Sequence, residues 1–120
     1  MVTSLKKSKQ GIFIFIGSEA TKIGGIQGTL YCSAKHGLLG FFKSFKAEAN
    51  KASVRATIIN PGMVRTSFFK NLKFSPGSDR ENAIEAEDIA ELVYFLCNSS
   101  KYINYSDINI DPLKKVIIKK

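Results

Sequence analysis

The chain has 120 residues, 18 of them basic and 10 acidic, and its formal net charge is +8. Hydrophobic residues make up 44% of it, which is ordinary for a globular protein and too high for a disordered chain. The length predicts one domain over residues 1–120. No apolar run approaches the roughly 20 residues of a membrane span, and no apolar stretch follows the N-terminal lysines, so we expect a cytoplasmic protein with no membrane partner and no secretory signal.

The basic excess raises the question of nucleic-acid binding. The lysines and arginines are scattered along the chain, and no zinc finger, basic zipper or aromatic-interleaved RNA motif accompanies them. A solvated, lysine-rich surface accounts for the charge. We therefore expect no nucleic-acid partner, and a basic binding protein is a third functional alternative beside the two given at the end of this section.

Several reactive or titratable residues receive ordinary structural explanations. Cys32 and Cys97 form no Cys-x-x-Cys pair and His36 is the single His, so the sequence predicts no metal site. Two reduced thiols are favoured over a disulfide. Glu19 is expected to face solvent.

Three segments predict a parallel sheet. Ile12–Ile16 is an uninterrupted run of β-branched and aromatic residues, the pattern of a strand buried on both faces. Residues 54–59 form a second buried strand, which ends at the turn of residues 60–62. Ile108 and Ile110 alternate with polar residues and predict a short third strand.

Two helices are expected between these strands. Apolar residues recur every three or four positions over residues 30–49, which predicts a long amphipathic helix, and acidic residues from position 85 open a second helix. Residues 63–85 are expected to be an irregular loop, and residues 116–118 either a strand or an apolar tail. The strand–helix–strand order predicts an α/β fold, a doubly wound parallel sheet in three α/β/α layers with right-handed crossovers.

Polar groups gather at the carboxyl edge of this expected sheet. Tyr31 and Lys35 lie four residues apart near the start of the long helix, so they share one face. An ammonium group beside a phenol favours the ionised phenol, which suits a Tyr to exchange a proton with a carbonyl or alcohol oxygen. Ser18 follows the first strand and the Pro61-Gly62 turn follows the second, at the edge where open parallel sheets bind ligands. Taken singly, each has an ordinary explanation as a surface pair or a turn.

The order and spacing of these features resemble the short-chain dehydrogenase/reductase family. The matching stretches are Ile14-Phe15-Ile16-Gly17-Ser18, Tyr31-Cys32-Ser33-Ala34-Lys35 and Asn60-Pro61-Gly62-Met63-Val64-Arg65-Thr66. Ser18 and Tyr31 are 13 residues apart (31 − 18), a spacing common in that family. The resemblance runs from about residue 11 to residue 112 and implies a Rossmann-like fold.

The resemblance also implies a function and a set of roles. The expected reaction moves a hydride between NAD or NADP and a carbonyl or hydroxyl carbon of a small-molecule substrate. Tyr31 would be the general acid and base, Lys35 would assist it and hold the nicotinamide ribose, and Ser18 would orient the substrate oxygen. The residues expected along the nicotinamide are Pro61, Gly62, Val64 and Thr66. Residues 67–82 would form a variable substrate lid, and residues 108–112 are similar to members acting on small hydroxy acids or aldehydes.

The sequence departs from the family in one large respect. It contains no glycine-rich turn of the kind that cradles a pyrophosphate, no Asn-Ala-Gly motif and no preceding catalytic Asn, so it resembles the C-terminal half of a member. Two principal alternatives follow: an oxidoreductase present as a truncated chain, or an inactive remnant with a dimerisation or structural role. A homo-oligomer through the helix that carries Tyr31 is expected in either case.

Overall fold

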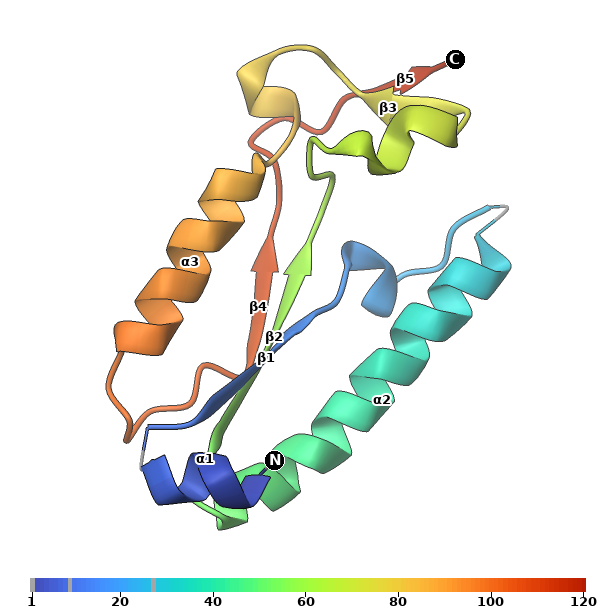
Figure 1. Cartoon of the computed structure of the whole chain (residues 1–120). Coiled ribbons are helices and arrows are strands. Elements are labelled where there is room, and N and C mark those ends of the chain that lie inside the picture. Colours follow the sequence, from blue (N-terminus) through green and yellow to red (C-terminus); the bar gives the residue numbers. More distant parts are fainter. Residues whose placement is uncertain (1, 9, 27) are drawn as a thin grey trace.

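The computed structural model describes residues 2–8, 10–26 and 28–120 as one α/β unit (Figure 1). Its helices and strands, in chain order, are α1 Val2–Ser8, β1 Ile12–Ile16, α2 Thr29–Lys51, β2 Arg55–Pro61, β3 Phe74–Pro76, α3 Ala86–Asn98, β4 Asp107–Ile110 and β5 Ile117–Lys119. Three 3₁₀ turns, η1 Glu19–Thr21, η2 Ser67–Asn71 and η3 Arg80–Asn82, lie in the connections. Within the described part of the chain, no helix combines the length and apolar character needed to cross a bilayer.

The main sheet has three parallel strands in the order β1-β2-β4. In its register Ile14 lies opposite Thr57, and Ile59 lies opposite Ile108. Helices α2 and α3 cover opposite faces of this sheet (Figure 1). The predicted α/β fold with a Rossmann-like parallel sheet in three layers is therefore confirmed.

The core lies mainly between β2 and α2. Every residue of β2 is buried, and Ala56 and Ile58 pack with Phe42 and Ala49 of α2. Successive side chains of a strand point to opposite faces. Thr57 and Ile59 therefore face the α3 layer, where Leu96 is fully buried.

One expectation about burial was wrong. The sequence predicted that β1 would be buried on both faces, but its first four residues are only half-buried and Ile16 is 47% exposed. The reason is position, because β1 lies at an edge of the described sheet and pairs with β2 on one side. An edge strand leaves a row of backbone groups that can pair with another chain.

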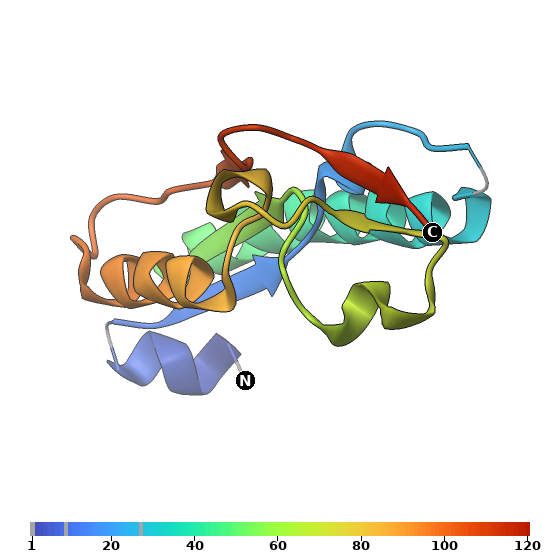
Figure 2. The ribbon, with the colours of Figure 1, turned by 90° about the horizontal axis from the view of Figure 1, so that it is seen from above.

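The segment between β2 and α3 is also more regular than expected. Instead of an irregular loop over residues 63–85, the structure has η2, β3 and η3. The short strand β3 pairs antiparallel with β5, which resolves residues 116–118 in favour of a strand (Figure 2). Strand β5 thus pairs with part of the segment between β2 and α3, which sequence analysis predicted to be a loop.

Candidate functional site

The residues singled out from the sequence meet at the carboxyl edge of the sheet. Gly17 and Ser18 follow β1, Pro61 ends β2, and the first turn of α2 brings Tyr31 to the same end of the molecule (Figure 1). A pocket of about 290 Å³ opens there. The residues that line it are Gly17, Ser18, Glu19, Ala20, Tyr31, Pro61, Gly62, Met63, Val64, Thr66, Phe68, Phe69 and Phe74.

Tyr31 and Lys35 lie on one face of α2, as their spacing predicts. The helix begins at Thr29, so Tyr31 is held within regular structure, and its side chain is 42% exposed toward the pocket region. The Lys35 Nζ lies 5.8 Å from the centre of the Tyr31 ring and donates a hydrogen bond of 3.4 Å to the Ile16 carbonyl. Lys35 therefore lies beside the phenol but is not among the pocket-lining residues.

Ser18 is buried and begins the 3₁₀ turn η1. Its Oγ accepts a hydrogen bond of 3.2 Å from the Ala20 backbone N–H, which fixes the hydroxyl as the N-cap of that turn. A hydroxyl that accepts in this way keeps its own proton for donation to another group. Ser18 can thus donate to an oxygen of a molecule in the pocket.

The segment after β2 forms the second wall. Gly62 N–H donates to the Ile110 carbonyl at 2.8 Å, and a Cβ on Gly62 would lie 3.1 Å from both Asp111 Oδ1 and Pro112 Cδ, so this turn lies tightly against the end of β4. Val64 forms a bridge to Ile84, and Thr66 Oγ1 accepts from Phe68 N–H at 3.3 Å as the N-cap of η2. The four residues expected along a nicotinamide, Pro61, Gly62, Val64 and Thr66, all line the pocket.

A buried amide network that the sequence did not reveal supports this edge. Asn60 is 1% exposed; its Oδ1 accepts from Thr21 Oγ1 at 3.0 Å and its Nδ2 donates to Asp107 Oδ1 at 2.7 Å. Thr21 belongs to η1, directly after Ser18, and Asp107 begins β4. The network therefore ties the Ser18 turn to two strands, and only the motif position of Asn60 before Pro61 hinted at it.

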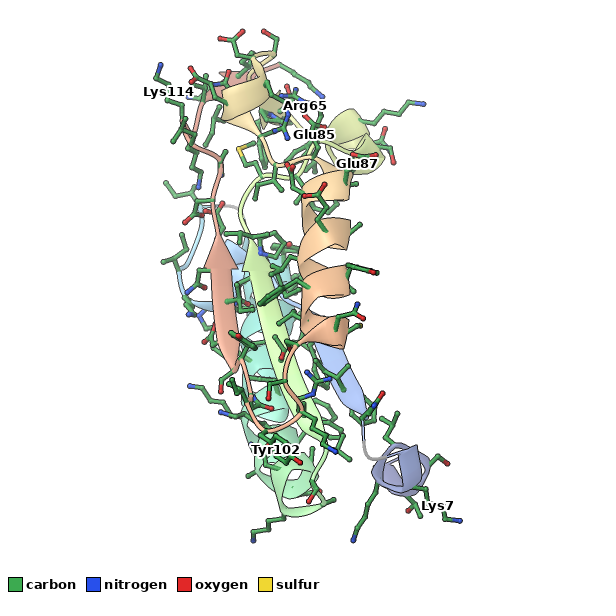
Figure 3. The ribbon with its side chains drawn as sticks, turned by 90° about the vertical axis from the view of Figure 1, so that its left-hand side faces the viewer. Lys7, Arg65, Glu85, Glu87, Tyr102 and Lys114 are labelled. Atoms are coloured by element: carbon green, nitrogen blue, oxygen red, sulfur yellow. The ribbon has the colours of Figure 1, made fainter. Side chains whose placement is uncertain are left out.

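Arg65 is a second supporting residue without a role in the sequence analysis. Its Nε donates to Glu85 Oε1 at 2.9 Å, and its two Nη atoms donate to the Gly77 and Asp79 carbonyls at 3.0 and 2.9 Å. Figure 3 shows the Arg65 and Glu85 side chains pointing toward one another. Arg65 thereby holds the end of the expected lid against the start of α3.

Glu19 has an ion-pair partner that sequence analysis did not predict. Its side chain is 31% exposed, so it contacts solvent as expected, and it also lines the pocket. Its carboxylate is paired with Lys115 from the C-terminal segment. Local sequence could not show this pair, because the two residues are 96 positions apart.

The described residues contain no group of three or more His, Cys, Asp or Glu side chains arranged to hold a metal ion. Cys32 and Cys97 are both free thiols. The groups at the pocket are the Tyr31 phenol with the Lys35 ammonium beside it, the Ser18 hydroxyl, the Glu19 carboxylate and apolar side chains.

A parallel α/β sheet with such groups at its carboxyl edge defines the Rossmann-type class, whose ligands bind outside the carboxyl ends of the strands. The family model described as short chain dehydrogenase matches residues 1–75. The chain belongs to the short-chain dehydrogenase family.

Individual relatives agree with this membership. The chain is 30% identical over 118 residues to the 3-oxoacyl-(acyl-carrier-protein) reductase FabG of Buchnera aphidicola subsp. Baizongia pistaciae, covering 92% of this chain and 48% of the relative. It is 26% identical over 118 residues to (+)-borneol dehydrogenase 1 of Salvia officinalis, covering 89% of this chain and 45% of the relative. The chain spans about half the length of the curated relatives it matches.

Among solved structures, an alcohol dehydrogenase from the archaeon Thermococcus sibiricus complexed with 5-hydroxy-NADP matches with a TM-score of 0.78 at 23% identity. The match covers 95% of this chain and 47% of that one. At this identity the likeness concerns the fold.

Proposed function

We propose that this chain carries the catalytic part of an oxidoreductase that moves a hydride between NAD or NADP and a carbonyl or hydroxyl carbon of a small molecule. The observation that supports the proposal is the convergence of Ser18, Tyr31, residues 61–64 and Thr66 on one pocket. These residues come from three separate segments, and they are the ones that the family resemblance singles out.

In this proposal Tyr31 Oη exchanges a proton with the substrate oxygen. In the oxidation direction the alcohol O–H proton passes to Tyr31 as the carbon–hydrogen bond breaks, and in reduction the proton returns. Lys35, whose ammonium lies 5.8 Å from the ring centre, assists Tyr31 in this proposal and would hold the nicotinamide ribose. Ser18 donates a hydrogen bond to the substrate oxygen and holds it toward Tyr31.

The residues present fit the nicotinamide end of the cofactor. Pro61, Gly62, Val64 and Thr66 line the same pocket as Tyr31 and would lie along the nicotinamide, and Lys35, beside the Tyr31 ring, would hold a ribose hydroxyl. When bound, NAD(P) supplies or accepts the hydride. The sequence contains no glycine-rich turn for the pyrophosphate, so we expect the 120-residue chain alone to bind NAD(P) poorly. Micromolar affinity in a calorimetric titration would contradict that expectation.

A second candidate is an inactive remnant of such an enzyme with a dimerisation or structural role. The observation that favours it is the exposed apolar surface on both elements beside the site: Ile16 of β1 is 47% exposed and Phe41 of α2 is 58% exposed. Such surface is typical of an interface with another chain. In either candidate we propose a cytoplasmic homo-oligomer formed through α2, which sedimentation analysis of the purified chain can test.

The test of the proposed function is a chimera. The N-terminal half of the Buchnera aphidicola FabG relative is joined before this chain, and NAD(P)H oxidation is followed with a panel of ketones and aldehydes. We expect Tyr31→Phe to lower kcat about 10²- to 10⁴-fold, the usual contribution of a general acid. Tyr102→Phe is the matched control, because Tyr102 is 87% exposed at the opposite end of the molecule (Figure 3).

Two outcomes would reject the proposal. Activity of the Tyr31→Phe chimera within tenfold of its parent would remove Tyr31 from the chemistry. A folded chimera that binds NAD(P)H but reduces no substrate would favour the inactive remnant.

A further inference from the structure

The candidate pocket has a predominantly apolar wall, which the lid segment builds. Ring centroids are 6.1 Å apart for Tyr31 and Phe68, 5.2 Å for Phe68 and Phe69, and 5.8 Å for Phe69 and Phe74. The rings therefore run in one series from the phenol to the far side of the pocket. Met63, 4% exposed, adds a further apolar surface. Walls of this kind favour a ligand with an apolar body.

The formal charges of the residues that line the pocket also favour an uncharged ligand. Among the described residues that line it, Glu19 alone carries a formal charge, and none is a Lys or Arg. A ligand carboxylate or phosphate would find no cationic side chain among these lining residues and would meet the Glu19 carboxylate. The Lys35 ammonium lies beside the Tyr31 ring but does not line the pocket, and it donates to the Ile16 carbonyl. Because an unpaired anion loses solvation on entering such a site, anionic ligands are disfavoured.

The C-terminal segment holds the Glu19 carboxylate in place. Lys115 Nζ lies 2.8 Å from Glu19 Oε1 and 2.6 Å from Oε2. The residues on either side of Lys115 are anchored to the lid, since the Lys114 carbonyl accepts from Asn82 Nδ2 at 3.2 Å and the Val116 carbonyl accepts from Gly77 N–H at 3.0 Å. Lys115 thus offsets part of the Glu19 charge from a fixed backbone.

We infer that the site selects an uncharged, apolar carbonyl compound or alcohol and rejects acids, and that Glu19, held and partly neutralised by Lys115, sets this selection. The inference rests on the proposed function, because it names the substrate class of the same pocket. Of the small hydroxy acids and aldehydes that the resemblance of residues 108–112 implied, it excludes the acids. Glu19 and Lys115 act here as specificity and positioning residues, with no part in the proton transfer.

The experiment compares two probes that differ only in charge, 4-oxo-4-phenylbutanoate and its methyl ester. Binding to the 120-residue chain is followed by the amide NMR shifts of Ser18, Tyr31 and Thr66. We expect the ester to bind at least about tenfold more tightly than the acid. This readout needs neither cofactor nor turnover, so its failure is distinct from a failure of the chimera to catalyse.

Two substitutions are expected to change the preference for the ester over the acid in opposite directions. Glu19→Lys is expected to tighten acid binding about tenfold and to leave ester binding within about twofold, while Lys115→Gln weakens acid binding about threefold by removing the offsetting charge. Glu48→Lys is the matched control, because it changes the net charge as Glu19→Lys does but lies on an exposed part of α2, and it should alter neither probe.

Four results would overturn the inference. They are an acid that binds the parent chain as tightly as its ester, no response of acid binding to Glu19→Lys, an equal response to Glu48→Lys, and no shift of the pocket amides with either probe. An unchanged acid-to-ester ratio in Lys115→Gln would remove Lys115 from the selection. Amide shifts outside the pocket report whether each variant keeps its fold.

Discussion

Gly17 and Asn60 face one another so closely that a Cβ on Gly17 would overlap the Asn60 side-chain oxygen. That oxygen also accepts from Thr21 Oγ1, and the Asn60 amide nitrogen donates to Asp107. The residue directly before Ser18 is therefore fitted against a buried amide whose hydrogen bonds reach η1 and β4. The position of the Ser18 hydroxyl depends on this contact.

Gly17→Ala should consequently destabilise the protein. The added methyl group must displace Asn60, which is 1% exposed and committed to several partners. Overpacking of this kind costs about 1–3 kcal/mol of the free energy of unfolding. Urea unfolding followed by far-UV circular dichroism measures the change. A variant as stable as the parent would show that the amide network can move without cost.

Gly37→Ala is the matched substitution, and we expect it to raise the free energy of unfolding, where Gly17→Ala lowers it. Gly37 lies within α2, and a Cβ there would meet no other atom within 4 Å. Alanine in an exposed helix interior is favoured over glycine by about 0.5–1 kcal/mol, because glycine loses more backbone freedom on folding. The same urea titration should therefore show a higher midpoint. The titration is run at a protein concentration where sedimentation shows a monomer, because the proposed oligomer through α2 would cover this face. A lower midpoint of the monomer would contradict the prediction.

Sequence analysis correctly predicted the elements whose residue patterns lie within one short stretch of the chain. The bounds of β1 agree with the unbroken apolar run Ile12–Ile16, and α2 extends only one or two residues beyond the stripe of residues 30–49. The parallel order also followed, because strand, helix and strand succeed one another along the chain. Ser18, Tyr31 and Pro61 could be placed at one edge for the same reason.

The features that sequence analysis missed depend on contacts between distant segments. The pairing of β3 with β5 joins residues whose patterns are too short to be distinctive, and the Glu19–Lys115 pair spans 96 positions. The predicted burial of β1 was wrong because its apolar residues show only that it could lie in a core. Whether a strand lies at the edge or in the middle of a sheet depends on the other strands. Asn60 and Arg65 were polar residues whose partners only the folded chain brings within reach.

Arg55→Met tests a buried cation that joins β2 to α3. Arg55 is 6% exposed, and its Nη1 donates to the Leu96 carbonyl at 2.9 Å and to Ser99 Oγ at 3.0 Å. These bonds satisfy the C-terminal end of α3, where a positive charge is favourable. Loss of the guanidinium removes these hydrogen bonds from a charged donor, which are worth about 1.5–3 kcal/mol, while the Leu96 carbonyl keeps the hydrogen bond from Ser99 Oγ at 2.8 Å.

The control for this change is Arg80→Met. Arg80 pairs with Asp88 at 2.8 Å, but its side chain is 64% exposed, and exposed ion pairs contribute about 0–1 kcal/mol. Thermal unfolding of the two variants under one buffer condition makes the comparison. Equal loss in both would show that burial of Arg55 adds nothing to its contribution.

Asp88 provides a pH-dependent test of the start of α3. Its carboxylate accepts from the Glu85 backbone N–H at 2.8 Å, completing a capping box, and from Arg80 Nη2 at 2.8 and 2.9 Å. The hydrogen bond from Glu85 and then that from Arg80 hold the pKa of Asp88 below its ordinary value of 3.8. A lowered pKa means that the folded state favours the ionised form, so this contribution to stability is complete above the unfolded pKa and is lost as pH falls through the folded one. We expect Asp88→Asn to melt at a lower temperature than the parent near neutral pH, and this difference in melting temperature to close as pH falls below about 4. Glu91→Gln, on the exposed surface of the same helix, removes an equal charge without a cap and should show a much smaller gap. A gap for Asp88→Asn that stays constant down to acidic pH would mean that the charge of Asp88 does not stabilise α3.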